Sequence, residues 1–372
     1  MRIPVLLMAV FVLLVSQVYA KAIKVGSTLA LSGPFSAIVS EILKGYTLAF
    51  EEARSQGKLD VEFVYYDDGF KPAVAAANAE RLIKEDGVDL VFGTTGDSAS
   101  LYVARILGLK KVVLFSPCTG VNVLYNPKVY PYVFMVRPPC KSEADALLSI
   151  MSKKYKRIGI VYLSRSLCGL DCMKTFLKRI RAKGVDVITA GILSATDIGV
   201  TVQKLKNAGV EAVYIALLPD LTRELIMAFA RANYFPHLYG GICSRIASVV
   251  KLNTIKEMSN FGEIYAALSF PLPSEDYGIS RSFRSALSRY RGTNEYTYDM
   301  FAGYVAAKVL VEVLSRVGEF NSPKELKNKI ESVGPVDVGL PEVIHYTPTN
   351  HMGFTKVYIY RVTPDGGFTP VK

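Results

Sequence analysis

Two neighbouring stretches decide the fold of this chain: Val88-Asp-Leu-Val-Phe-Gly-Thr-Thr-Gly-Asp-Ser-Ala-Ser100 and Lys111-Val-Val-Leu-Phe-Ser-Pro-Cys-Thr-Gly-Val-Asn122. Each begins as a short apolar run and stops at a cluster of Gly, Thr and Ser, which is typical of a buried parallel strand that ends in a polar loop. A helical pattern follows the first loop through Leu101, Ala104 and Leu107. We therefore predict that the first loop joins a strand to a helix in an α/β sheet.

This first loop is a candidate binding site. In open α/β sheets, ligands settle beyond the carboxyl ends of the strands, and N–H groups at a helix start attract anions. Hydroxyl groups come from Thr94, Thr95, Ser98 and Ser100, and a carboxylate comes from Asp97. The alternative is that Asp97 or Ser98 only caps the helix and that the glycines only make turns.

The same alternation of strand, loop and helix runs through most of the chain. Two earlier strands are expected at Ile23–Leu29 and at 61–66, each followed by an amphipathic helix. After a break at Val136-Arg-Pro-Pro-Cys140 the alternation restarts with a strand at Arg157–Leu163, and a last strand is expected at 357–362. Such alternation indicates parallel sheets with helices on both faces. We predict an α/β fold of two doubly wound parallel-sheet lobes.

We expect each lobe to be built from separate pieces of chain. Residues 21–137 and 270–340 are assigned to the first lobe, and residues 138–269 and 341–372 to the second. The chain then crosses between the lobes at three places: after about Arg137, within 266–273 and within 334–346. Several crossings make a hinge, and two lobes on a hinge can close over a ligand.

Residues 1–20 have the layout of a secretory signal. One basic residue, Arg2, precedes an apolar run from Val5 to Val15, and small and polar residues follow up to Ala20. We expect cleavage after Ala20, with an uncleaved membrane anchor as the alternative. No later apolar run approaches the roughly 20 residues of a membrane span. We therefore place the mature chain outside the cytoplasm, in the periplasm or at the outer cell surface.

The formal net charge of +11 comes partly from basic clusters at 153–157 and 174–183. We interpret these clusters as solvated helix faces, with a docking face for acidic lipid head groups or a partner as the alternative. We predict no nucleic-acid binding, because the chain has no concentrated strip of basic and aromatic residues.

An exported location permits disulfides, and an odd number of cysteines leaves at least one thiol free. The five cysteines are Cys118, Cys140, Cys168, Cys172 and Cys243. The short spacing of Cys168 and Cys172 suggests a local disulfide between them. A single CxxxC is weak evidence for a metal, so we predict no metal site. The other pairings stay open.

Short segments spread in order over nearly the whole mature chain resemble one known family. They include Leu31-Ser-Gly-Pro34, Tyr66-Asp-Asp68, Gly87-Val-Asp-Leu-Val-Phe-Gly93, Ser116-Pro117, Ile158-Gly-Ile-Val161 and Tyr298-Asp299. The family is the type I periplasmic solute-binding proteins, and the branch is the leucine/isoleucine/valine-binding one that serves ABC importers. Each segment is short, and their order makes the resemblance specific.

The resemblance implies a two-lobed receptor that performs no chemistry and uses no cofactor. It implies that the first lobe holds the amino and carboxyl groups of an amino acid through two loops. The candidate contacts are Thr95, Asp97, Ser98, Cys118, Thr119 and Gly120. The implied partners are a small-molecule ligand and the ABC permease subunits in the membrane. We expect a monomer, with a dimer as the alternative.

The second lobe departs from the family pattern. Cys168 and Leu218 stand where aromatic residues are usual, and Ile242 stands where an acid usually meets the ammonium group of the ligand. A buried ammonium without a carboxylate is costly. Either Asp97 therefore supplies the charge, or the ligand is not a free amino acid. Two arginines are candidates to hold an anion from this side, with a plain surface position as the alternative: Arg165 and Arg245.

No motif of a known catalytic site is present. The sequence has no HExxH, paired CxxC, GxGxxG or Walker loop, and Cys118 has no base at a recognisable spacing. We expect no enzyme activity. The expected function is the capture of a small polar or amphipathic ligand for an ABC importer, such as an amino-acid-like molecule, an amide or a small organic acid. The alternative is a sensing receptor of the same fold that signals to a partner.

Overall fold

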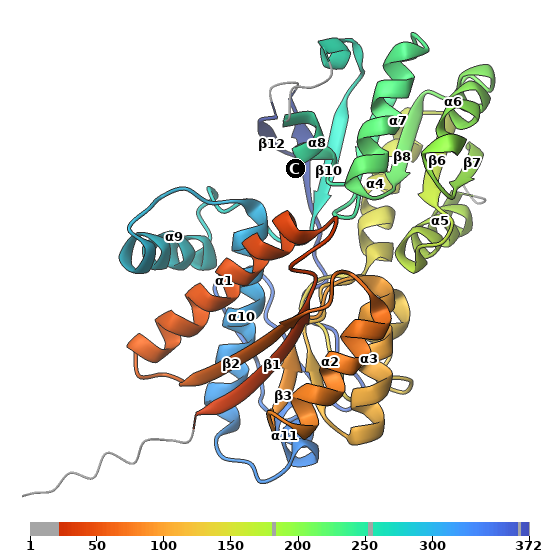
Figure 1. Cartoon of the computed structure of the whole chain (residues 1–372). Coiled ribbons are helices and arrows are strands. Elements are labelled where there is room, and N and C mark those ends of the chain that lie inside the picture. The colour runs from red at the N-terminus through yellow and green to blue at the C-terminus, as the bar shows by residue number, and fades with distance from the viewer. Residues whose placement is uncertain (1–21, 181–183, 252–255, 364–365, 372) are drawn as a thin grey trace, which may run out of the picture.

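The computed structural model describes residues 22–180, 184–251, 256–363 and 366–371 and arranges them as two α/β lobes (Figure 1). The expected secretory signal, residues 1–20, lies outside this described part. None of the described helices is both long and apolar enough to cross a membrane. The predicted fold class, two wound lobes with parallel-sheet cores, is confirmed.

The first lobe contains a five-stranded parallel sheet in the order β2-β1-β3-β4-β5. Its strands are β1 (Ile23–Leu29), β2 (Val61–Asp67), β3 (Leu90–Phe92), β4 (Val113–Phe115) and β5 (Val133–Phe134). Strands β3 and β4 pair directly, with Phe92 beside Phe115. Their polar loops therefore emerge side by side at one edge of the sheet.

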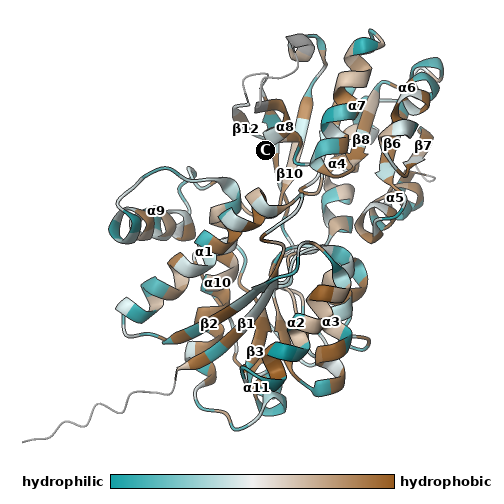
Figure 2. Ribbon diagram, in the orientation of Figure 1, coloured by the Kyte–Doolittle hydropathy of each residue, from teal (hydrophilic) through white to brown (hydrophobic). Residues whose placement is uncertain are grey.

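Helices cover both faces of this first sheet. They are α1 (Ser36–Ser55), α2 (Pro72–Lys84), α3 (Asp97–Lys110), α9 (Gly278–Arg291), α10 (Tyr298–Val317) and α11 (Pro323–Ile330), with a short 3₁₀ turn at Asn122–Tyr125. Phe92 packs with α1 and α10, whereas Val91 packs with α2 and α3, because successive side chains of a strand point to opposite faces. Figure 2 shows hydrophobic colours along the strands.

The second lobe contains a seven-stranded sheet in the order β12-β11-β10-β9-β8-β6-β7. Strands β6 to β10 are parallel, while β11 and β12 add an antiparallel edge. The strands are β6 (Arg157–Leu163), β7 (Asp186–Ile192), β8 (Ala212–Ala216), β9 (His237–Gly240), β10 (Ile264–Leu268), β11 (Tyr358–Val362) and β12 (Phe368–Pro370). The helices are α4 (Cys140–Lys154), α5 (Leu167–Ile180), α6 (Ile198–Asn207), α7 (Pro219–Arg231) and α8 (Ile246–Lys251), with 3₁₀ turns at Ala195–Asp197 and Lys256–Asn260.

The chain crosses between the lobes three times, and the third crossing lies later than we expected. The first follows β5 and the second follows β10. The assignment of residues 341–372 to the second lobe is wrong for its first part, because Tyr346 and Phe354 are buried in the core of the first lobe. Tyr346 also donates a hydrogen bond to the Met135 carbonyl, 2.8 Å away. The third crossing therefore lies between Phe354 and β11.

Helices α1 and α10 pack closely because glycines face each other at their contact. A Cβ atom added to Gly45 would lie 2.1 Å from the Met300 carbonyl oxygen, and one added to Gly303 would lie 2.3 Å from the Ile42 carbonyl oxygen. No larger side chain fits at either position without moving a backbone. This close pair positions the start of α10, which faces the second lobe.

Candidate functional site

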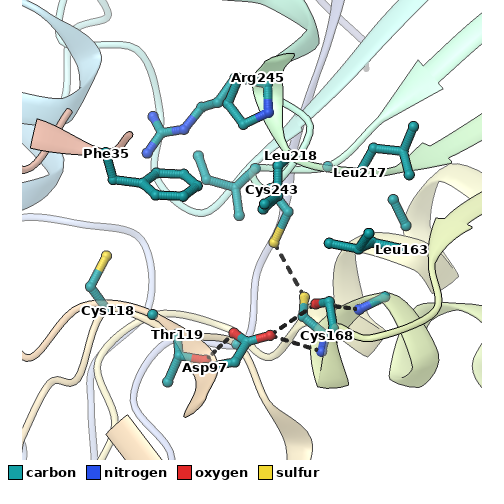
Figure 3. Close-up of a pocket in the computed structure, with 18 of the residues that line it drawn as sticks. Phe35, Asp97, Cys118, Thr119, Leu163, Cys168, Leu217, Leu218, Cys243 and Arg245 are labelled. Carbon is teal, nitrogen blue, oxygen red and sulfur yellow. Dashed lines mark hydrogen bonds between the residues drawn. The ribbon is translucent and has the colours of Figure 1, made fainter. Parts of the chain in front are cut away.

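A cavity of about 470 Å³ lies between the two lobes. The structure places all eleven residues that we predicted for the site on its walls: Thr95, Asp97, Ser98, Cys118, Thr119, Gly120, Arg165, Cys168, Leu218, Ile242 and Arg245. Figure 3 shows several of them facing one another across the cavity. Their contact with a ligand remains a prediction.

Two adjacent loops form the first-lobe wall. Gly96 has a φ of 89° and precedes α3, and this left-handed conformation suits a residue without a Cβ. The Cys118 N–H donates to the Thr94 carbonyl at 2.6 Å, and Thr95 and Cys118 form a parallel bridge. This bridge extends the β3–β4 pairing beyond the strands and fixes the two loops side by side.

Asp97 connects the two lobes through its carboxylate. It accepts hydrogen bonds from the Thr119 hydroxyl at 2.8 Å, the Ser166 hydroxyl at 3.0 Å and the Cys168 N–H at 3.1 Å. The alternative that Asp97 only caps α3 is wrong, because the cap residue is Gly96 and Asp97 lies within the first turn. Figure 3 shows these bonds as dashed lines.

The second-lobe wall is mainly apolar. Leu163, Leu217, Leu218 and Ile242 line it, and Phe35 faces them from the first lobe. Sequence reasoning missed Leu163, Leu217 and Phe35, although Phe35 directly follows the Leu31-Ser-Gly-Pro34 segment. An apolar wall of this kind suits the hydrocarbon part of a ligand.

The disulfide differs from the one suggested by the sequence. Cys168 pairs with Cys140 rather than with Cys172. Cys172 is buried as a free thiol, and its pKa is raised well above the ordinary value by burial. The reason for the difference is that Cys168 and Cys172 lie on one helix, α5, whereas the start of α4 brings Cys140 beside Cys168.

Arg245 does not lie at a plain surface position. It comes from the loop before α8 and forms an ion pair with Asp299, at the start of α10 in the first lobe. Burial alone would lower the pKa of Arg245, but Asp299 raises it above its usual value. Arg165 lies exposed and forms no ion pair within the described residues. Arg165 therefore has the exposed position that was its alternative, although it also lines the cavity, and of these two arginines it is the one without a charged partner in the described part of the chain.

A buried ion pair between Arg137 and Glu143 lines the cavity and was missed by sequence reasoning. The Arg137 Nη2 donates to Glu143 at 2.6 Å, and the Ile242 N–H donates to the same carboxylate at 3.0 Å. Within the described residues, the Arg137 Nε is buried without a partner. The sequence marked Arg137 only as part of a chain crossing.

Burial makes the Cys118 thiol a poor nucleophile at neutral pH. Burial raises the pKa of Cys118, although Arg137 and Arg245 oppose the shift. A raised pKa leaves the thiol protonated at neutral pH, and the nucleophilic form of cysteine is the thiolate. Cys118 therefore lines the cavity as a largely protonated thiol.

The chain matches a family model described as a periplasmic binding protein over residues 22–367. The Leu/Ile/Val-binding protein homolog 7 of Brucella suis biovar 1 (strain 1330) is 22% identical over 327 residues, which cover 81% of this chain and 78% of that protein. Homolog 6 from the same strain is 28% identical over 222 residues, which cover 58% of this chain and 56% of that protein.

Solved structures share the fold over nearly the whole chain. A leucine/isoleucine/valine-binding protein described as possible, from Rhodopirellula baltica SH 1, gives a TM-score of 0.82 at 21% identity and covers 95% of this chain and 97% of that one. A branched-chain amino acid ABC transporter protein from Thermus thermophilus with bound valine gives a TM-score of 0.82 at 17% sequence identity. The match covers 95% of this chain and 96% of that one. A fatty acid ABC transporter substrate-binding protein from Thermomonospora curvata gives a TM-score of 0.80 at 18% sequence identity. The match covers 95% of this chain and 92% of that one.

Proposed function

Because this chain belongs to the periplasmic binding protein family, we propose that it is the solute-binding component of an ABC importer of the branched-chain amino acid type. It works outside the cytoplasm as a monomer and delivers its ligand to permease subunits in the membrane. The names of the relatives and structural neighbours, which include Leu/Ile/Val-binding and ABC transporter proteins, support this assignment.

One observation carries the proposal: the cavity draws its walls from both lobes. A ligand that fills it contacts both lobes only when they are closed. Binding therefore stabilises the closed form. The volume of about 470 Å³ lies in the usual range of small-molecule sites, roughly 300–1,000 Å³.

The distribution of polar and apolar walls favours an amphipathic ligand. Thr95, Ser98 and Thr119 supply hydroxyls on the first-lobe side, next to the N–H groups at the start of α3. The facing side offers Leu217 and Ile242. A polar head group fits against the first lobe, with its hydrocarbon part against the second.

Asp97 decides which charge the head group carries. Its Oδ1 accepts the Thr119 bond, while its Oδ2 accepts both bonds from the second lobe. A carboxylate has about four acceptor positions, so Asp97 keeps capacity for an ammonium group. The start of α3 and Arg165 instead favour a carboxylate. An amino acid satisfies both, whereas an amide or an organic acid satisfies one.

Thermal shift with ligands that share one hydrocarbon tail tests the proposal. We expect leucine, leucinamide or isocaproic acid to raise the melting temperature, since a ligand at a hundredfold excess over its Kd adds about 2.7 kcal/mol of stability. Other amino acids, aromatic acids and nucleosides complete the panel. If no member of the panel shifts the melting temperature, the proposed solute-binding function is contradicted.

The variant Asp97→Asn identifies the role of the carboxylate. If Asp97 holds an ammonium group, leucine and leucinamide lose about tenfold or more in affinity, roughly 1.4 kcal/mol, and isocaproic acid does not. Equal losses for all ligands would mean that Asp97 acts only by joining the lobes. Asp276→Asn, at an exposed aspartate of the first lobe, is the matched control and should leave every affinity unchanged.

A further inference from the structure

Three cysteine sulfur atoms lie together at the cavity wall, where the disulfide Cys140–Cys168 meets the free thiol of Cys243. The Cys243 Sγ lies 3.2 Å from the Cys168 Sγ and 4.0 Å from the Cys140 Sγ. Figure 3 shows the shorter contact as a dashed line. Thiol–disulfide exchange proceeds when a thiolate that contacts one sulfur of a disulfide attacks it in line with the bond that breaks. The two distances place the Cys243 Sγ beside the Cys140–Cys168 bond, so the Cys243 side chain must rotate before it attacks Cys168.

Both cysteines of the disulfide lie at helix starts. Cys140 is the first residue of α4, which has 15 residues, and Cys168 is the second residue of α5, which has 14. The partial positive charge at a helix N-terminus stabilises a thiolate. Cys140 is therefore a good leaving group when the disulfide is attacked at Cys168.

The disulfide also touches the first-lobe loops. The Cys140 N–H donates to the Gly120 carbonyl at 2.9 Å, and the Cys168 N–H donates to Asp97 at 3.1 Å. A Cβ atom on Gly120 would lie 2.4 Å from the Cys140 Sγ. A change of disulfide partner therefore acts at the contact between the lobes.

We propose that Cys140, Cys168 and Cys243 form a thiol–disulfide exchange site with two pairings, Cys140–Cys168 and Cys168–Cys243. The Cys243 thiolate attacks the Cys168 Sγ, the bond between Cys140 and Cys168 breaks, and its electron pair leaves on the Cys140 Sγ. The proton of Cys243 goes to solvent and Cys140 takes one up. No oxidant or reductant is consumed. The site rests on the three sulfurs alone and is independent of the ligand.

The surroundings of Cys243 set the pH at which exchange runs. Burial, together with Glu143 on α4 and Asp97 on α3, raises the pKa of Cys243 to about 12, and Arg137 and Arg245 oppose this shift. Few molecules carry the thiolate at neutral pH. Exchange is therefore slow at neutral pH. As the pH rises toward the pKa of Cys243, the exchange rate increases about tenfold for each pH unit.

The test maps disulfide partners in the native full-length chain without added reductant. Samples held at about pH 7.5 and about pH 9.5 are quenched with acid, blocked with N-ethylmaleimide, digested and analysed for linked peptides by mass spectrometry. We expect the Cys168–Cys243 pair to appear beside Cys140–Cys168, about a hundredfold faster at the higher pH. Cys243→Ser should hold Cys140–Cys168 alone, and Cys172→Ser should behave like the unchanged chain.

A second variant tests the pairing when the original partner is absent. In Cys140→Ser, with glutathione disulfide as the oxidant, we expect a Cys168–Cys243 disulfide, because these sulfurs are already in contact. Its failure to form in a folded variant would overturn the exchange site. So would a native chain that holds Cys140–Cys168 alone at both pH values. Disulfides that include Cys118 would also overturn it, since they indicate reshuffling through unfolded chains.

Discussion

The carboxylate of Asp97 accepts the backbone N–H of Cys168 across the boundary between the lobes, at 3.1 Å. The acceptor lies in the first turn of α3 and the donor in the first turn of α5, so the starts of two helices from different lobes face each other. The ion pair of Arg245 with Asp299 is a second bond across the same boundary. Closure of the lobes therefore depends on side chains of the cavity itself.

Arg245→Ala should favour an open arrangement of the lobes. The change leaves the largely buried Asp299 side chain without its partner, and truncation of one member of a buried charge pair costs about 2 kcal/mol or more. Small-angle scattering should give a larger radius of gyration for this variant in the absence of ligand. Asp276→Asn, which changes an exposed aspartate, serves as the control. An unchanged radius for Arg245→Ala would show that the ion pair does not hold the lobes together.

Glu143→Ala should destabilise the whole protein. Glu143 is buried and accepts bonds from Arg137, the Ile242 N–H and the Ser269 hydroxyl. Its loss leaves a guanidinium buried without a partner, which costs about 3–5 kcal/mol. Urea denaturation measures the change. The control Glu80→Ala removes only an exposed pair with Lys84 and should stay within about 1 kcal/mol.

The ionised carboxylate of Asp67 should contribute to the free energy of unfolding, and this contribution should be lost at acid pH. Burial alone would raise the pKa of Asp67, but hydrogen bonds from Ser32, Gly69 and Leu31 lower it below its ordinary value. A lowered pKa in the folded state contributes stability above the unfolded pKa of about 3.9 and loses it as the pH falls.

The unfolding free energy of Asp67→Asn should therefore differ from that of the unchanged chain most above about pH 5 and least near pH 3. The variant keeps an acceptor oxygen, so the comparison isolates the charge. Urea denaturation at a series of pH values gives the difference. A difference that stays constant over this range would contradict the prediction.

Gly303→Ala should force α1 and α10 apart. The added Cβ would lie 2.3 Å from the Ile42 carbonyl oxygen, and overpacking of this kind costs typically about 1–3 kcal/mol. The matched control is Gly108→Ala in α3, where an added Cβ meets nothing within 4 Å. That variant should gain up to about 1 kcal/mol, because alanine favours a helix more than glycine does. The melting temperature should therefore fall in Gly303→Ala and rise in Gly108→Ala.

Local pattern was enough to predict two wound lobes and to place the loops after β3 and β4 at one edge of the first sheet. Apolar runs such as Val113–Phe115 ended where the structure ends strands, and the parallel order of β3 and β4 brought Asp97 and Thr119 within hydrogen-bond distance. A strand followed by a polar loop and a helix carries this information in consecutive residues. The resemblance to a binding-protein family supplied most of the other candidates, and all eleven line one cavity.

Contacts between distant segments could not be predicted in this way. The partner of Cys168 depends on where α4 begins relative to α5. The pairing of Arg137 with Glu143 likewise depends on where α4 begins, because Glu143 lies in its first turn. The last crossing was placed too early because the segment containing Tyr346 has no strand or helix pattern of its own. Its position follows from burial against Phe115 and Phe134.

Because the chain crosses between the lobes three times, no single cut in the coding sequence separates one complete lobe from the other. A contiguous fragment that ends near residue 137 encodes the five strands of the first sheet but not α10, whose apolar face covers α1. Such a fragment would expose the buried side of α1, and the remaining fragment would carry α10 without α1 packed against it. Each lobe is therefore completed only by residues translated after the other lobe has begun.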